Sequence, residues 1–356
     1  MIGAGLFGSH IAIELAKLGS DVCLVDYEKE IVAGTSANSI MRVHSGLHYP
    51  RDFDTAFQSR QGQNPFNSYY QDCIRDDFEN FYGLAKNFSK SSKSQIEKIA
   101  ESAGINVVEV SPKELADTGI ASDLLEAAWK VNEGVVDVPR LRDFYLTEIQ
   151  ASQIELVLGQ KIVQVDFQDR SWKVETDQGF LGNFSHVVRA THGRNSFNSN
   201  IFEITNQIFE YHWTSMLEIS TEAASFGMTV LDGDFISLLP AGNGNNFFVY
   251  GPGVSILEKF TGQIPPKNWN GLNYEKEADL ISNSQELLRH WFPNFPEYVS
   301  VGTRTTVRSV QAGVSQTDRR VTQVSEIFPS FLDVHSTKID HVIEACDTVI
   351  RILDLN

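Results

Sequence analysis

The chain has 356 residues, 42% of them hydrophobic, which is long for one hydrophobic core and suits two domains of ordinary size. Its formal net charge of −17 argues against a nucleic-acid surface or an anionic membrane as a partner. Three widely spaced cysteines, Cys23, Cys73 and Cys346, lack C-x-x-C spacing and are expected to be buried free thiols in a reducing compartment.

Residues 1–26 carry the clearest motif. Gly3, Gly5 and Gly8 form G-x-G-x-x-G, followed by a helical run over 11–18 and a strand over 21–25 that ends in Asp26. Gly3 permits a tight turn, Gly5 lets a pyrophosphate approach the backbone, and Gly8 allows close helix–strand packing. The phosphates would lie at the helix N-terminus, with Asp26 accepting hydrogen bonds from ribose hydroxyls. A glycine-rich turn without a ligand is the alternative, and the flanking helix and strand favour dinucleotide binding.

The first strand expected before such a turn is almost missing, because only Met1 and Ile2 precede Gly3. The chain therefore either begins further upstream or is a truncated form. No signal peptide can be placed before this motif, and no apolar run is long enough to span a bilayer. A cytoplasmic location is expected.

After Asp26, residues 34–50 are rich in small hydroxyl side chains and carry two histidines and an arginine. This composition predicts either a surface loop or a loop that contacts a phosphate and a ring. Helices are predicted over 52–61 and 69–88, and the second has an apolar face that is interpreted as core: Phe78, Phe81, Tyr82, Leu84 and Ala85.

The rest of the chain alternates helical and strand patterns. Helices are predicted over 94–103, from 112, and over 140–151, 274–291 and 339–353. Strands are predicted over 105–110, 186–190, 211–219, 229–231, 235–239 and 246–250, with a β-meander over 154–185. Residues 261–272 are predicted to be a loop, and 299–310 a strand pair or a strand plus a loop.

Four segments in this order resemble the D-amino-acid oxidase-like FAD-dependent oxidoreductases, a group that includes glycine and sarcosine oxidases, 2-hydroxyglutarate dehydrogenases and glycerol-3-phosphate dehydrogenases. The first is the glycine motif with Asp26, where the family more often has Glu. The second, Thr35-Ser-x-Asn-Ser-x-x-Arg-x-His-x-Gly46, is similar to the family's serine-rich loop that ends in His-x-Gly. The third, 187–191, resembles the strand end Ala-Thr-Gly, although His192 stands before Gly193. The fourth, 334–340, resembles the segment where a helix N-terminus points at the flavin pyrimidine.

The resemblance implies FAD as cofactor and an α/β fold. A Rossmann-like FAD-binding domain, with its first strand nearly missing, would comprise 1–75, 130–205 and 300–356. A β-rich α+β cap for the substrate would comprise 76–129 and 206–299. The residues implied to bind FAD are Gly3, Gly5, Leu6, Phe7, Gly8, Asp26, Tyr27, Thr35, Ser36, Asn38, Ser39, Arg42, Val43, His44, Ile162, Val163, Ala190, Thr191, Gly193, Ser336, Thr337, Lys338 and Ile339.

Few residues are candidates for catalysis. His44 or His48 would lie beside the flavin as hydrogen-bond donor, base or covalent attachment point, and Tyr250 would face the substrate. Arg304 corresponds to the carboxylate-binding arginine of several family members, whereas Arg308 is expected to form a salt bridge. His192 is either a flavin contact that replaces a glycine or a solvated turn residue. No residues have metal-ligand spacing, and no Ser/His/Asp set indicates hydrolysis.

Three functions from different classes remain open. The first is an FAD-dependent oxidase or dehydrogenase that removes a hydride from a C–H beside an amine or hydroxyl of a small metabolite bearing a carboxylate, with an unspecified electron acceptor. The second is a flavin monooxygenase of similar fold. The third is a protein with this fold that binds FAD weakly or not at all. The first is the prediction adopted.

Overall fold

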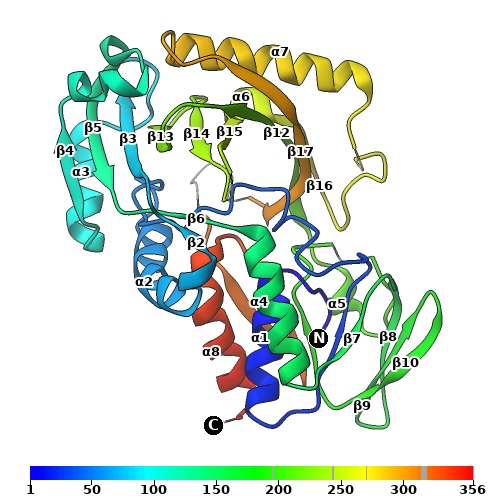
Figure 1. Cartoon of the computed structure of the whole chain (residues 1–356). Coiled ribbons are helices and arrows are strands. Elements are labelled where there is room, and N and C mark those ends of the chain that lie inside the picture. The colour runs from blue at the N-terminus through cyan, green and yellow to red at the C-terminus, as the bar shows by residue number, and fades with distance from the viewer. Residues whose placement is uncertain (195, 243, 270, 314–318, 356) are drawn as a thin grey trace.

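The computed structural model describes residues 1–194, 196–242, 244–269, 271–313 and 319–355. This part of the chain builds a largely parallel sheet near the N-terminus and a nine-stranded, mostly antiparallel sheet above it (Figure 1). Helices cover both sheets, so the predicted α/β class is confirmed. None of the helices described is long and apolar enough to cross a membrane.

The parallel sheet contains the N-terminus itself. Ile2 donates its N–H to the Val188 carbonyl at 2.8 Å, and the Val25 N–H donates to the Met1 carbonyl at 3.0 Å. Ile2 therefore joins two strands in the way that a longer first strand would. The strands in spatial order are β7 (Glu155–Val157), β1 (Cys23–Val25), Ile2, β11 (Val187–Arg189), β19 (Phe331–His335) and β18 (Gln323–Phe328), of which β18 is antiparallel.

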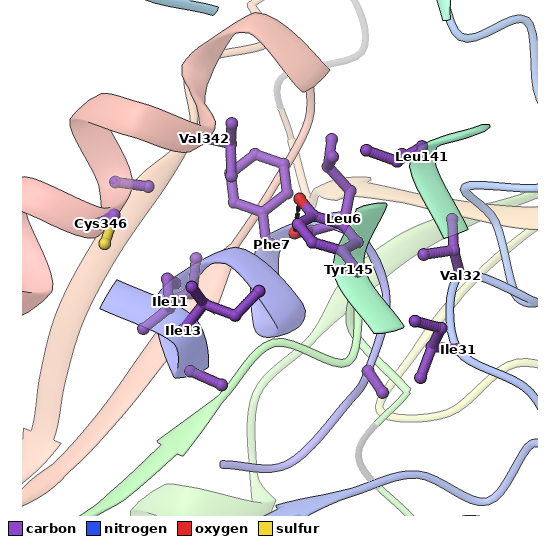
Figure 2. Packing of buried hydrophobic residues seen from close by; sticks show 14 of the residues in the cluster. Leu6, Phe7, Ile11, Ile13, Ile31, Val32, Leu141, Tyr145, Val342 and Cys346 are labelled. Carbon is purple, nitrogen blue, oxygen red and sulfur yellow. Dashed lines mark hydrogen bonds between the residues drawn. The ribbon is translucent and has the colours of Figure 1, made fainter. Parts of the chain in front are cut away.

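Helices pack on one face of this sheet. Helix α1 (Leu6–Lys17) lies between α4 (Val138–Ala151) and α8 (Val342–Ile352), and α2 (Phe53–Tyr69) packs beside α8 (Figure 1). Figure 2 shows side chains of all three central helices meeting, including Phe7 of α1 and Val342 of α8. The Tyr145 hydroxyl of α4 also donates to the Leu6 carbonyl at 3.0 Å. These contacts fix the start of α1, which borders the glycine turn.

The opposite face is covered by a three-stranded meander, β8 (Ile162–Gln168), β9 (Ser171–Thr176) and β10 (Gly179–Phe184). Val165 and Trp172 of this meander pack in one core with Val25 and Phe331 of the parallel sheet. The predicted meander began at residue 154, but β7 pairs in parallel with β1 and so belongs to the other sheet.

The nine-stranded sheet forms the upper part of the molecule (Figure 1). Its order is β16 (Ile256–Gly262), β12 (Phe209–Thr221), β15 (Asn246–Tyr250), β14 (Ser237–Pro240), β13 (Phe226–Leu231), β3 (Glu79–Ala85), β5 (Leu125–Val131) and β4 (Val107–Val110), with β17 (Tyr298–Gln311) paired to β12. Side chains of α7 (Tyr274–Trp291) and of α3 (Lys93–Ala103) pack into two separate cores of this sheet. The short remaining elements are η1 (Gln71–Cys73), β2 (Ile74–Arg75), η2 (Pro112–Thr118), η3 (Ser122–Leu124), β6 (Val135–Val136), α5 (Phe202–Thr205), α6 (Pro252–Ser255) and η4 (Ile339–His341).

One predicted helix is wrong. Residues 69–88 form η1, β2 and β3 instead, and every residue of β3 from Phe81 to Ala85 is buried. A strand buried on both faces carries a continuous apolar run, which also contains helical spacing and cannot be distinguished by periodicity alone. Strand β17 is one continuous strand, and β18 and β19 had not been predicted.

The predicted helices over 94–103, 140–151 and 274–291 agree closely with α3, α4 and α7. The three cysteines are buried and free, as expected. The division into two domains stays a prediction. The structure adds that β17 crosses the proposed boundary at residue 300 while pairing with β12 along its length.

Candidate active site

A cavity of about 800 Å³ runs from the glycine turn to the nine-stranded sheet. This size lies within the roughly 300–1,000 Å³ typical of small-molecule sites. It is lined by the start of α1, the loop over 34–51, the strand ends at 190–194 and 336–339, and residues of β12 to β17. Segments far apart in the sequence thus share one chamber.

The three glycines of the motif have different surroundings. Gly3 has a φ of +100°, and a Cβ there would lie 2.6 Å from the Ala190 carbonyl oxygen; at Gly8 a Cβ would lie 1.7 Å from the Gly3 carbonyl oxygen. These two positions exclude a side chain because of the protein's own backbone. At Gly5 the nearest atom to a Cβ is Ser36 Oγ, 3.5 Å away, so the space in front of Gly5 is open cavity.

Helix α1 presents an uncapped N-terminus to this space. Gly5 is its N-cap and supplies no side chain, and no acidic residue stands in the first turn. The Leu6 N–H donates to Ser36 Oγ at 3.3 Å. The free N–H groups of the first turn and the helix dipole favour an anion at this point.

Asp26 lies beside the glycine turn and lines the same end of the cavity. One carboxylate oxygen accepts the Ala4 N–H at 2.6 Å and the other accepts the Glu28 N–H at 2.9 Å. Burial raises the pKa of this carboxyl, and the two backbone bonds oppose that rise. Tyr27 and Ile162 line the same end.

Arg42 anchors the loop over 34–51 to the nine-stranded sheet. Its Nε pairs with Glu133, and its two terminal nitrogens donate to Thr229 Oγ1 at 2.6 Å and to Asn80 Oδ1 at 3.2 Å. Glu133 also accepts from the Ser45 N–H at 2.7 Å. The donors of Arg42 are therefore occupied by protein, and the residue borders the cavity mainly as a support for His44 and its neighbours.

Four side chains converge where this loop meets the segment after β19. The rings of His44 and His48 lie 5.2 Å apart, Tyr49 lies 4.9 Å from His48, and Lys338 Nζ lies 4.5 Å from the centre of the Tyr49 ring. Burial, and next Lys338, hold the pKa of both histidines well below the usual value. Burial lowers the pKa of Lys338 to about 8, against the opposing charge of Asp340.

Three buried polar atoms of this group have no hydrogen-bond partner in the described part of the chain: His44 Nδ1, His48 Nδ1 and the Tyr49 hydroxyl. Burying such atoms unpaired costs free energy, so their presence beside a cavity indicates a polar ligand that would satisfy them.

His192 is a structural residue of the turn after β11. The Ser309 N–H donates to its Nε2 at 3.0 Å, so Nδ1 carries the proton and donates to the Ser336 carbonyl at 2.9 Å. Burial lowers its pKa to about 3, so the ring stays neutral. His192 is therefore not a solvated turn residue, because it ties the turn to β17 and to the segment after β19. It also lines the cavity, and its contact with the flavin stays a prediction.

The cavity wall opposite the loop comes from the nine-stranded sheet. Arg308 of β17 lies with its guanidinium 5.0 Å from the centre of the Tyr250 ring and has no ion-pair partner among the residues that the structure describes. Arg304 lies outside the cavity lining and pairs with Glu218 at 2.7 Å. Four residues along a strand span about 13 Å, so the two arginines share a face but only Arg308 reaches the chamber.

Most of the predicted site residues share this chamber. Those that line it are Gly3, Gly5, Leu6, Phe7, Asp26, Tyr27, Thr35, Ser36, Ser39, Arg42, His44, His48, Ile162, Ala190, Thr191, Tyr250, Ser336, Thr337, Lys338 and Ile339. Those outside its lining are Gly8, Asn38, Val43, Val163, Gly193 and Arg304. Gly8 and Gly193 are needed for close packing, and Asn38 donates to the Ala33 and Gly34 carbonyls within its own loop.

Sequence reading missed Arg308 and His212 as lining residues, along with the pair Arg51–Asp232. The alternation of β17 indicates which side chains share a face, but the depth of each along the cavity depends on the pairing of β17 with β12. No local signal in the sequence carries that pairing.

These residues fit an FAD molecule. The open space at Gly5 beside an uncapped helix N-terminus suits a pyrophosphate, and Asp26 suits a ribose. The unpaired atoms of His44, His48 and Tyr49 lie where the resemblance places the flavin ring, and Lys338 supplies a positive charge there.

Comparisons with known proteins agree with this geometry. The family model described as "FAD dependent oxidoreductase" (DAO) matches residues 1–330. A curated relative, the FAD-dependent monooxygenase FPY4 of Fusarium mangiferae, is 25% identical over 99% of this chain and 90% of its own. The fold is similar to that of L-alpha-glycerophosphate oxidase from Mycoplasma pneumoniae (TM-score 0.79, 13% identity, 99% of this chain and 93% of that one). It is also similar to glycine oxidase from Geobacillus kaustophilus (TM-score 0.73, 11% identity, 99% and 93%).

Proposed function

This chain belongs to the family of FAD-dependent oxidoreductases with FAD as cofactor, and on that premise we propose that it removes a hydride from a C–H beside an amine or hydroxyl of a small carboxylate-bearing metabolite. FAD supplies the ring that accepts the hydride. The protein supplies binding and orientation, and its own side chains suit these tasks.

The observation that carries the proposal is Arg308. A guanidinium without an ion-pair partner in the described structure, on the wall of a cavity, attracts an anion. A carboxylate matches its planar donors in a two-pronged arrangement. Arg308 and the loop histidines line the same cavity. A carboxylate on Arg308 therefore brings the rest of a small substrate toward His44, His48 and Tyr49.

The histidines suit hydrogen bonding to the substrate. Burial holds the pKa of each imidazole well below its usual value, so each ring is neutral near pH 7 and keeps a nitrogen that can accept a hydrogen bond from the hydroxyl or amine of the substrate. The chamber is lined by the loop and the sheet, and holding the substrate there fixes the reacting C–H relative to the cofactor. Lys338, just before η4, places a positive charge beside the same group of side chains.

The test is anaerobic mixing of the FAD-loaded protein with a panel of amino acids and 2-hydroxy acids, followed by the visible absorption of the flavin. We expect at least one carboxylate-bearing member to bleach the flavin in the absence of oxygen. A holo-protein that no amino or hydroxy acid reduces would contradict the proposal.

A second candidate comes from the curated relative, which is named a monooxygenase and matches nearly the whole chain. A monooxygenase of this kind needs an external reductant, so NADH or NADPH would bleach the flavin and the organic substrate alone would not. The same anaerobic experiment with NAD(P)H in a separate arm therefore separates the two functions.

A further inference from the structure

Three adjacent strands place a row of basic side chains on the cavity wall. In the nine-stranded sheet, His212 of β12 lies directly opposite Lys259 of β16 on one side and Arg308 of β17 on the other. Residues opposite one another in an antiparallel sheet point to the same face. All three line the cavity. Lys259 is exposed, His212 is buried and Arg308 is half-buried, so the row leads from the outer edge of the chamber inward.

The alternation of β12 separates this row from the apolar side of the sheet. Trp213, the next residue along, packs on the other face against Trp269 with stacked rings 5.8 Å apart. Glu258, directly opposite Trp213, is held on that other face by Lys276 Nζ at 2.6 Å and Trp269 Nε1 at 3.0 Å. Glu258 also borders the cavity, but its carboxylate is bound by Lys276 and Trp269 and forms no ion pair with Lys259 in the described structure.

The acids near the row leave it with excess positive charge. Glu210 accepts from His212 Nε2 at 2.6 Å. On the cavity wall formed by the β13–β14 hairpin, Asp232 is bound by Arg51 Nε at 2.9 Å, and Asp234 is exposed at the turn. Arg320 also lines the chamber, and its charge is felt at both His48 and His212.

Two cations at the ends of the row are therefore available to a ligand. Lys259 and Arg308 stand two inter-strand steps apart, about 10 Å between backbones, with His212 between them. One carboxylate on Arg308 does not account for Lys259. Resting on the proposed function, we propose that the substrate carries a second anionic group, which binds Lys259 while the first carboxylate binds Arg308.

The test uses non-reacting anions and the visible spectrum of the FAD-loaded protein, which shifts when a ligand enters the chamber. The probes are pentanoate, glutarate with the same carbon chain and a second carboxylate, and 4-phosphonobutyrate with a phosphonate in its place. We expect glutarate or 4-phosphonobutyrate to bind at least about tenfold tighter than pentanoate, as one added charge-assisted contact would give. The tighter of the two identifies the second group as carboxylate or phosphate-like.

Variants locate the second group. Lys259→Met should remove most of the preference for the dianion and leave the affinity for pentanoate unchanged. Lys276→Met, the same replacement on the opposite face, should keep the preference. Equal affinities of the three probes in the parent protein would overturn the proposal while leaving a single carboxylate on Arg308 intact. If pentanoate also fails to bind, the carboxylate site of the proposed function falls with it.

Discussion

Arg42 and Glu133 form a buried ion pair in which the side chains are 3% and 0% exposed. The pair connects the loop that carries His44 and His48 to the nine-stranded sheet, because Glu133 also accepts from Ser45 N–H and Arg42 donates to Thr229. Each partner is buried only because the other is present. The position of the loop histidines thus depends on two residues outside the reaction.

Removing one member of this pair should be costly. Glu133→Gln leaves a buried guanidinium without its counter-charge, and we expect a loss of about 3–5 kcal/mol in the free energy of unfolding. In the double variant Arg42→Met/Glu133→Gln, the loss should be smaller than the sum of the two single losses by roughly 0.5–3 kcal/mol. Urea unfolding of the parent, both single variants and the double variant measures this. Additive losses would show that the two side chains do not act as a pair.

A second prediction concerns the glycine turn. Gly5→Val should lose FAD, with at least about a tenfold weaker affinity, because its side chain would occupy the open space assigned to the pyrophosphate. Since that space holds no protein backbone, the variant should still fold, as circular dichroism would show.

Gly8→Ala is the matched contrast. Its Cβ would lie 1.7 Å from the Gly3 carbonyl oxygen, so we expect loss of the fold itself. Full flavin occupancy in Gly5→Val would refute the placement of the pyrophosphate.

His192 provides a pH prediction. Its folded pKa of about 3 lies below the usual 6.5, so the unfolded chain binds the proton more readily. The contribution of His192 to stability is therefore complete above pH 6.5 and is lost as the pH falls toward 3. At pH 5 about 2 kcal/mol of this contribution to the free energy of unfolding should be lost, because each pH unit below 6.5 removes about 1.36 kcal/mol.

His192→Asn isolates this effect, since Asn tolerates the left-handed backbone found here, φ +52°. At pH 8 the variant should be less stable than the parent, because two hydrogen bonds are lost. At pH 5 the gap should shrink by about 2 kcal/mol in denaturant unfolding. A gap that stays constant between the two pH values would mean that His192 is not held neutral in the fold.

The sequence predicted the parts of the molecule that depend on local signals. Helix α3 begins at the capping box of Ser92 and Gln95 and ends at Gly104 in the left-handed conformation, and both signals can be read from the sequence. Strand β3 could not be assigned in this way, because its burial on both faces results from its position between β13 and β5. Only the folded sheet reveals that position.

The candidate site divides along the same line. The glycine turn and the loop over 34–49 are continuous in sequence, and most of their predicted residues line the cavity. The cavity wall formed by the nine-stranded sheet is assembled from strands distant in sequence, so the position of each side chain along the cavity depends on strand pairing. For example, His212 lies opposite Arg308 because of the register of β12 with β17. The role of His192 likewise depends on Ser309 and Ser336, more than a hundred residues away.

The two arginines of β17 give the last prediction. Arg308→Leu should raise the KM for a carboxylate substrate roughly 10- to 150-fold, the equivalent of about 1.5–3 kcal/mol for hydrogen bonds to a charged group. FAD content should not change, because the side chain of Arg308 lies beside Tyr250 on the wall formed by the nine-stranded sheet. Arg304→Leu is the control on the same strand and face. Its side chain is 46% exposed, pairs with Glu218 and lies outside the cavity lining. We therefore expect its KM to stay close to that of the parent. A larger rise in KM for Arg304→Leu than for Arg308→Leu would show that Arg304 binds the carboxylate. The two arginines differ mainly in their position along β17, so this comparison tests which position faces the substrate.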